Sequence, residues 1–190
     1  MRPTKRDELV AKALEVFYRN GFHATGMDML VAESGISKTS MYKHFRTKED
    51  LILASLRLRD ENFRNWLFRR MEELADTPRG QLSALFVALA EWFKEDTYRG
   101  CMFIKASAEF QEADHPIHVQ AAEHKRLLFS FVKELAAKAG AQDPAALASS
   151  LLLLKDGAIV TAQMGYGDDP ATAAAQTAEI LLEVAFGPAT

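Results

Sequence analysis

A run of hydrogen-bond donors between residues 37 and 44 is the part of this sequence best suited to binding chemistry. Its donors are Ser37, Lys38, Thr39, Ser40, Tyr42, Lys43 and His44, and the apolar residues among and beside them are Ile36, Met41 and Phe45. A short helix over this run would have one apolar face and one donor face. Such donors bind phosphate oxygens and base edges, so the run predicts a helix that enters the DNA major groove. The alternative is an ordinary solvated amphipathic helix.

The residues just before the run predict a tight turn between two helices. Gly35 suits the left-handed position that ends a helix, and Ser37 suits the N-cap that begins the next one. Residues 27–34 predict the helix before the turn, and Thr25 is its expected cap. Together these elements predict a helix-turn-helix, with a first helix over residues 7–20 packed across it.

A long helix is predicted to follow, over residues 48–75. Thr47 is its expected N-cap. Lys48 lies in its first turn, where a cation and free backbone N–H groups together can hold a phosphate. The predicted DNA-binding domain is residues 1–47, which contain the helix-turn-helix and end where this long helix begins.

The N-terminal quarter of the chain resembles the DNA-binding region of TetR-family transcriptional regulators. The resemblance is carried by Gly21-Phe22-His23-Ala24-Thr25, residues 27–34, the run from Gly35 to Phe45, and Lys48-Glu49-Asp50-Leu51. It implies phosphate contacts from Thr25 and Lys48, operator DNA as a partner, a homodimer, and a ligand pocket between body helices. Arg99-Gly100-Cys101 is also similar to the opening of the central body helix in some members.

The rest of the chain predicts an all-α ligand-binding and dimerisation domain over residues 48–190. Four prolines each stand where the first residue of a helix would lie, and no segment alternates long enough for a strand. The predicted body helices cover residues 78–95, 100–111, 116–139, 144–164 and 170–186.

Aromatic residues, methionine and one acid in the domain over residues 48–190 are candidate contacts for a small-molecule effector. Aromatic rings and Met form adaptable pocket walls, and a charge among apolar residues must find a partner. The candidates are Trp66, Trp92, Phe103, Phe110, Phe129, Asp156 and Met164. Each apolar one also suits an ordinary core, and Asp156 also suits a solvated helix edge.

Two stripes near the C-terminus predict a subunit interface. One comprises Leu147, Leu151, Leu154, Ala158 and Thr161; the other comprises Ala173, Thr177, Ile180, Leu181 and Val184. The resemblance implies a four-helix bundle with the same helices of a second subunit. In a monomer, these stripes would instead pack onto the body.

Other chemistries have little support. His115, His118 and His124 have no cysteine pair or fixed metal motif beside them, and no nucleophile, P-loop or dinucleotide motif appears. We therefore expect no metal, no cofactor and no enzymatic activity. Cys101, with Arg99 and Lys105 nearby to favour a thiolate, leaves a redox sensor as an alternative.

Composition and charge fit a cytoplasmic protein that touches DNA with one end. The net charge is −3, but residues 1–50 contain nine Lys or Arg against seven Asp or Glu. A single cysteine excludes an internal disulfide, and neither a secretory leader nor a membrane span is evident. The expected function is a homodimeric repressor released from its operator by a small molecule. A ligand-independent DNA-binding or nucleoid-organising protein is the other alternative.

Overall fold

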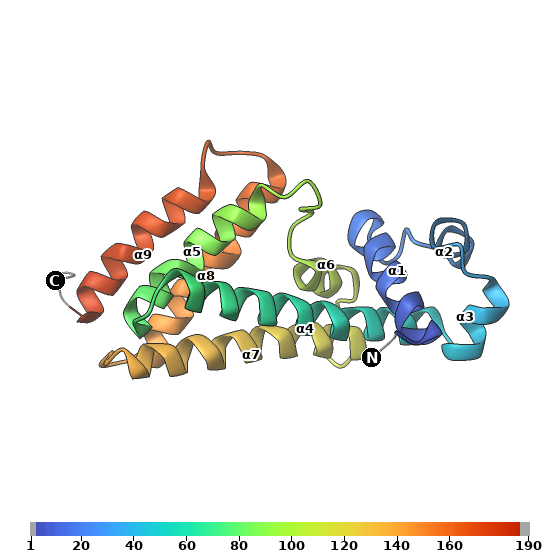
Figure 1. Ribbon diagram of the computed structural model, residues 1–190, viewed down its shortest axis with the longest axis horizontal. Helices are drawn as coiled ribbons and strands as arrows, with labels where there is room; N and C mark the ends of the chain where they lie inside the picture. Colours follow the sequence, from blue (N-terminus) through green and yellow to red (C-terminus); the bar gives the residue numbers. More distant parts are fainter. Residues whose placement is uncertain (1–2, 187–190) are drawn as a thin grey trace. The chain divides into compact units, whose positions relative to one another are not determined.

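The computed structural model describes residues 3–186, and every regular element in this range is an α-helix, which confirms the predicted all-α class. The first four helices are α1 (Lys5–Asn20), α2 (Met27–Ser34), α3 (Lys38–His44) and α4 (Lys48–Leu74). The others are α5 (Pro78–Phe93), α6 (Met102–Glu109), α7 (Pro116–Lys138), α8 (Pro144–Met164) and α9 (Pro170–Phe186) (Figure 1).

The chain forms two compact units. The first contains residues 1–63 and 102–124, and the second contains residues 64–101 and 125–190. Both α4 and α7 contribute residues to each unit. The division into these two units does not coincide with the predicted domain boundary after residue 47. That boundary concerns function, and it stays a prediction.

The first unit is built around the side chains that α1 turns inward. Leu9, Ala13 and Phe17 are fully buried, and Met41 of α3 is buried with them. Phe22, in the α1–α2 loop, packs its ring against Phe17 at 5.6 Å between centroids. This core holds the short helices α2 and α3, which are too short to be stable alone.

The second unit packs α5, α8 and α9 together (Figure 1). Small buried residues of α9, Ala171, Ala174 and Ala178, allow the close approach. Asp143 caps α8 by accepting the N–H of Ala146, and Pro144 takes the first helical position, as expected. By length and composition alone α8 is apolar enough to cross a membrane, but a single such helix packed in a helical body is weak support for that.

The structure corrects the predicted α8 interface stripe. Leu147, Leu151 and Ala158 are buried within their own chain and are not free for a second subunit. The exposed apolar residues of α8 are Leu153 and Met164 instead. Because Leu151 to Leu154 are four consecutive leucines, periodicity could not show which of them turns inward.

The start of α6 lies two residues after the predicted start at residue 100, within the few residues expected for such a boundary. The helix begins at Met102, and residues 99–101 precede it. Gly100 has φ +79°, outside the helical region, so the Arg99-Gly100-Cys101 segment leads into the helix and does not form its first turn.

Candidate nucleic-acid interface

The turn between α2 and α3 has the predicted geometry. Gly35 lies in the left-handed region with φ +68°, and its N–H donates to the carbonyl of Val31. The Ser37 hydroxyl accepts the N–H of Ser40 at 3.2 Å, which confirms it as the N-cap of α3. Lys12 of α1 donates to the carbonyl of Ser34 at 2.6 Å. The turn is therefore held both by its own residues and by α1.

The donor face of α3 points to solvent. Met41 and Phe45 are buried, whereas Thr39, Tyr42 and Lys43 are exposed. None of these three makes a hydrogen bond or ion pair among residues 3–186. Their donors are thus available to a ligand at no cost in broken contacts. Ser40 and His44, on the same helix, are partly buried.

Lys38 is the one long donor of α3 that is already engaged. Its Nζ lies 3.1 Å from Oδ1 of Asp28 in the first turn of α2. By accepting this hydrogen bond, Asp28 raises the pKa of Lys38 above its ordinary value, so the ammonium is charged at neutral pH. The pair is exposed, and exposed pairs are weak. Lys38 can therefore exchange Asp28 for a phosphate or a base edge.

Lys48, the first residue of α4, binds the α1–α2 loop. The Nζ of Lys48 donates to the carbonyls of Phe22 and Thr25, at 3.1 and 3.3 Å. Thr47 caps α4 as predicted, since its hydroxyl accepts the N–H of Asp50. Lys48 thus joins the start of α4 to the loop before α2.

Thr25 does not cap α2, which corrects the expectation from sequence. The N-cap is Gly26, and Thr25 is fully buried with its hydroxyl donating to the carbonyl of Gly21 at 2.6 Å. The hydroxyl stabilises the loop from inside. The contact of Thr25 with phosphate stays a prediction.

A carboxylate from far along the chain holds the same loop, and no residue pattern predicted this contact. Glu109, at the end of α6, accepts the N–H of Phe22 at 3.0 Å with each oxygen and the N–H of His23 at 2.6 Å. Gly21 has φ +84°, and a Cβ there would lie 3.0 Å from the Glu109 carboxylate. One turn earlier, Lys105 donates to the carbonyl of Tyr18 near the end of α1. Two side chains of α6 therefore fasten the end of α1 and the loop before α2.

Comparison with known proteins agrees with this interface. Residues 9–55, from α1 into α4, match the family model described as bacterial regulatory proteins, tetR family. The crystal structure of a TetR-family transcriptional regulator from Streptomyces coelicolor superposes with a TM-score of 0.86 and 29% sequence identity, covering 95% of each chain. Residues 9–55 therefore belong to the TetR family of bacterial regulatory proteins.

Curated relatives extend the likeness beyond the DNA-binding region. The transcriptional regulator YjdC of Escherichia coli is 26% identical over 155 residues, which is 82% of this TetR-family chain and 81% of YjdC. The transcriptional repressor KstR2 of Mycolicibacterium smegmatis is 35% identical over 91 residues, 46% of this chain and 42% of KstR2. These proteins are DNA-binding regulators, and this TetR-family protein is a regulator and not an enzyme.

The seven effector candidates of this TetR-family protein are divided between the two units. In the first unit, Phe103 stacks on the buried His124 at 3.6 Å, and Phe110 packs edge-on against Phe22. In the second unit, Trp66 lies 6.5 Å from Trp92, and Met164 is 70% exposed. Phe129 and Asp156 alone among the seven line one hollow of the second unit. Effector binding by any of the seven stays a prediction.

The remaining polar candidates have protein partners. His118 contacts the carbonyl of Phe110 at 2.8 Å, and His124 contacts Asp60 at 2.7 Å. Residues 3–186 contain no group of three potential metal ligands. Cys101 is buried, with 6% of its surface exposed.

Proposed function

We propose that this TetR-family protein is a cytoplasmic homodimeric repressor that leaves a palindromic operator when a small molecule binds its body. Residues 1–47 would bind the DNA, and residues 48–190 would bind the effector and form the dimer. Repression is favoured by the similarity to KstR2, which is named a repressor, although the relative FasR, 32% identical over 96 residues, is named an activator.

The exposed, unengaged donors of α3 are the observation that carries the DNA-binding part. Thr39, Tyr42 and Lys43 lie on one face of a helix capped by Ser37 and anchored by Met41. A helix so presented can insert into a major groove, where Lys binds guanine and Thr contacts either base edges or the thymine methyl group. Lys48 would supply phosphate contacts next to the first turn of α4.

Exposed apolar side chains on α8 and α9 support the homodimer. Leu153 and Met164 of α8 are 73% and 70% exposed, and Ile180 and Val184 of α9 are 62% and 83% exposed. Ile180 and Val184 are four residues apart, and Leu153 and Met164 are eleven apart, or about three helical turns, so each pair lies on one face of its helix. Water would cover these apolar stripes in a monomer, and a second copy would remove them from water.

The effector would act by favouring one arrangement of the two DNA-binding regions in the dimer. A ligand shifts such an equilibrium only through different affinities for the two states. Coupling of ~1–3 kcal/mol would lower operator affinity about 5- to 150-fold, and operator would weaken effector binding by the same factor. Helix α4 is one covalent route for this coupling, because it begins shortly after α3 and ends in the second unit.

Selection from random DNA duplexes, followed by fluorescence anisotropy, tests the DNA-binding part. We expect a palindrome whose half-sites are about one helical turn, or a multiple of it, apart. Lys43→Ala should change the preferred base in each half-site, by ~1–3 kcal/mol per contact. Lys48→Ala should weaken all sequences alike and reduce the salt dependence of binding by one phosphate contact.

Lys133→Ala is the matched control, since Lys133 is an exposed lysine of α7 with no partner among residues 3–186. It removes the same charge and should leave the operator preference and the salt dependence unchanged. An unaltered base preference for Lys38→Ala, Thr39→Ala and Lys43→Ala would show that α3 does not read the operator. Binding to all duplexes with equal affinity would instead favour the ligand-independent, nucleoid-organising alternative. The redox alternative requires oxidant to change operator affinity and Cys101→Ser to abolish that response.

A further inference from the structure

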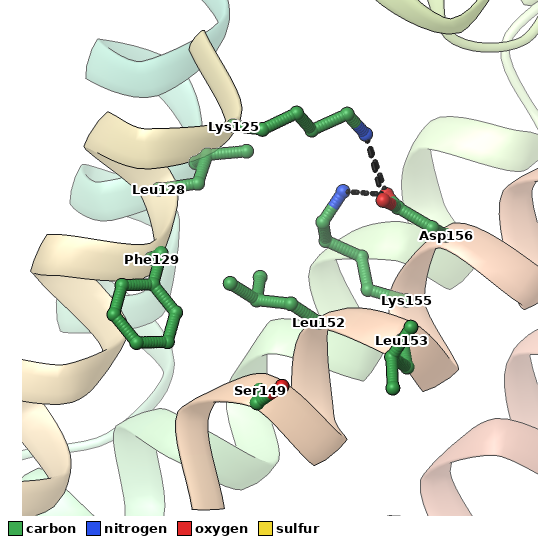
Figure 2. Close-up of a pocket in the computed structure, with 8 residues that line it drawn as sticks. All are labelled: Lys125, Leu128, Phe129, Ser149, Leu152, Leu153, Lys155 and Asp156. Carbon is green, nitrogen blue, oxygen red and sulfur yellow. Dashed lines mark hydrogen bonds and ion pairs between the residues drawn. The ribbon is translucent and has the colours of Figure 1, made fainter. Parts of the chain in front are cut away.

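The second unit contains a hollow between α7 and α8 that no part of the DNA-binding role explains. It has a volume of about 230 Å³ and is lined by Lys125, Leu128, Phe129, Ser149, Leu152, Leu153, Lys155 and Asp156. Figure 2 shows Phe129 of α7 and Leu152 of α8 on either side of it, with the amino groups of Lys125 and Lys155 converging on Asp156. The hollow therefore has apolar walls and one charged end.

The charged end has one positive charge in excess. Nζ of Lys125 lies 2.8 Å from both oxygens of Asp156, and Nζ of Lys155 lies 2.5 Å from Oδ1. The Lys155 side chain is 2% exposed, whereas those of Lys125 and Asp156 are 31% and 32% exposed. Two ammonium groups thus share one carboxylate in a place where water cannot fully screen them.

The protein leaves part of this charge unbalanced. Each ammonium carries three donors, and Asp156 is the only acceptor of Lys155 among residues 3–186. Burial, and then the neighbouring charge of Lys125, lowers the pKa of Lys155. Burial alone would raise the pKa of Asp156, but the two lysines outweigh it and hold that pKa below its ordinary value. A second anion beside the lysines would relieve their repulsion.

The walls and the size of the hollow restrict what that anion can be. Leu128, Phe129 and Leu152 favour an apolar body, and an excess of one charge matches one negative charge better than two. The volume is below the ~300–1,000 Å³ of common ligand pockets, so the molecule must be small. The excess positive charge would repel a cation, and an inorganic phosphate would leave the apolar walls uncovered.

We propose that this hollow binds the carboxylate of a small aromatic or branched aliphatic acid, with the carboxylate on Lys125 and Lys155 and the apolar body against Leu128, Phe129 and Leu152. This names the chemical class of the effector, so its regulatory role rests on the proposed function. Leu153 lies both on the rim of the hollow and on the exposed stripe assigned to the dimer. A bound acid would therefore be placed next to the subunit interface.

Isothermal titration calorimetry of the full chain with benzoate and 3-methylbutanoate tests the site. We expect saturable binding of at least one acid, and no binding of its uncharged amide or of inorganic phosphate. Lys125→Met and Lys155→Met should each weaken binding about 10- to 100-fold, the loss of one charge-assisted hydrogen bond. The matched control Lys133→Met should bind like the wild type.

Asp156→Asn gives the decisive result, because a misfolded protein cannot produce it. The substitution removes the carboxylate that competes with the ligand, so the acid should bind more tightly than to the wild type. The proposal is overturned if neither acid binds, if the amide binds as well as the acid, or if Asp156→Asn weakens binding.

Operator binding measured with and without the acid separates this proposal from the proposed function. An acid that binds the hollow, depends on both lysines and leaves operator affinity unchanged would confirm the site and refute its role as effector site. Conversely, release of operator by an acid that acts equally on Lys125→Met and Lys155→Met would support effector control and refute this site.

Discussion

Replacing Glu109 by alanine should weaken operator binding, although Glu109 lies in α6 and α3 carries the proposed DNA contacts. Its carboxylate accepts the N–H groups of Phe22 and His23, and this loop leads directly into α2. Lys48 binds the carbonyl side of the same loop. Without Glu109, the loop would keep its contact with Lys48 but lose the one that holds its amides.

The size of the effect follows from these contacts. A hydrogen bond to a charged group contributes ~1.5–3 kcal/mol, and the Glu109 carboxylate accepts such bonds from two amides. The His23 amide lies at an exposed residue where water can replace the carboxylate, and the Glu109 side chain is 25% exposed. We therefore expect a total loss in unfolding free energy near the value of a single such bond, ~1.5–3 kcal/mol. For a chain of this size, the melting temperature should fall by about 3–12 °C.

The free energy of operator binding should weaken by less than the loss in unfolding free energy. If the held loop is favoured by ~2 kcal/mol, nearly all molecules are ready to bind, and removing ~1.5–3 kcal/mol leaves roughly 15–70% of them ready. Apparent affinity scales with that fraction, so binding should weaken about 1.4- to 6-fold. The salt dependence of binding should stay unchanged, because Glu109 contacts no phosphate in the proposed complex.

Three measurements test the role of Glu109. Hydrogen exchange should accelerate at the amides of Phe22 and His23, the melting temperature should fall, and fluorescence anisotropy should report weaker operator binding. Glu109→Gln keeps one acceptor oxygen and should give an intermediate result. Glu112→Ala is the matched control, because it removes an exposed carboxylate three residues later that has no partner among residues 3–186. Wild-type exchange at Phe22 and His23 in Glu109→Ala would refute the assigned role of this carboxylate.

Two further predictions concern the second unit. Val184→Glu should convert the proposed dimer to a monomer, because it places a charge on the exposed α9 stripe. The control Glu183→Gln changes a neighbouring exposed position and should leave the dimer intact. Light scattering at micromolar concentration distinguishes the two outcomes, and a monomeric wild type would refute the dimer. The depressed pKa of Asp156 adds stability that is complete above the ordinary carboxyl pKa of 3.8 and is lost as pH falls through the lower folded-state pKa. Denaturant unfolding should therefore show less loss of stability below pH 4 for Asp156→Asn than for the wild type, and equal acid sensitivity would contradict the assigned pKa.

Elements whose causes are local could be predicted from residue order. Ser37 and Thr47 cap helices through hydroxyls that accept a backbone N–H from three residues away. Gly35 adopts a left-handed backbone conformation that residues other than glycine rarely adopt. The donor face of α3 follows from helical periodicity, since Met41 and Phe45 share the buried side. Interactions within three or four residues are visible in residue order alone.

Tertiary structure decided what joins distant segments. Glu109 meets Phe22 across 87 positions, and Lys125 meets Asp156 across 31, and no spacing rule connects either pair. Thr25 turned inward to the carbonyl of Gly21 because the loop folds back on itself, so Gly26 became the cap of α2. In α8, whose leucines cover several faces, only packing against α5 and α9 selected Leu151 for the core and left Leu153 in solvent. An apolar helix can bury any of its faces, and the free energy of burying one depends on which neighbours the whole chain brings to it.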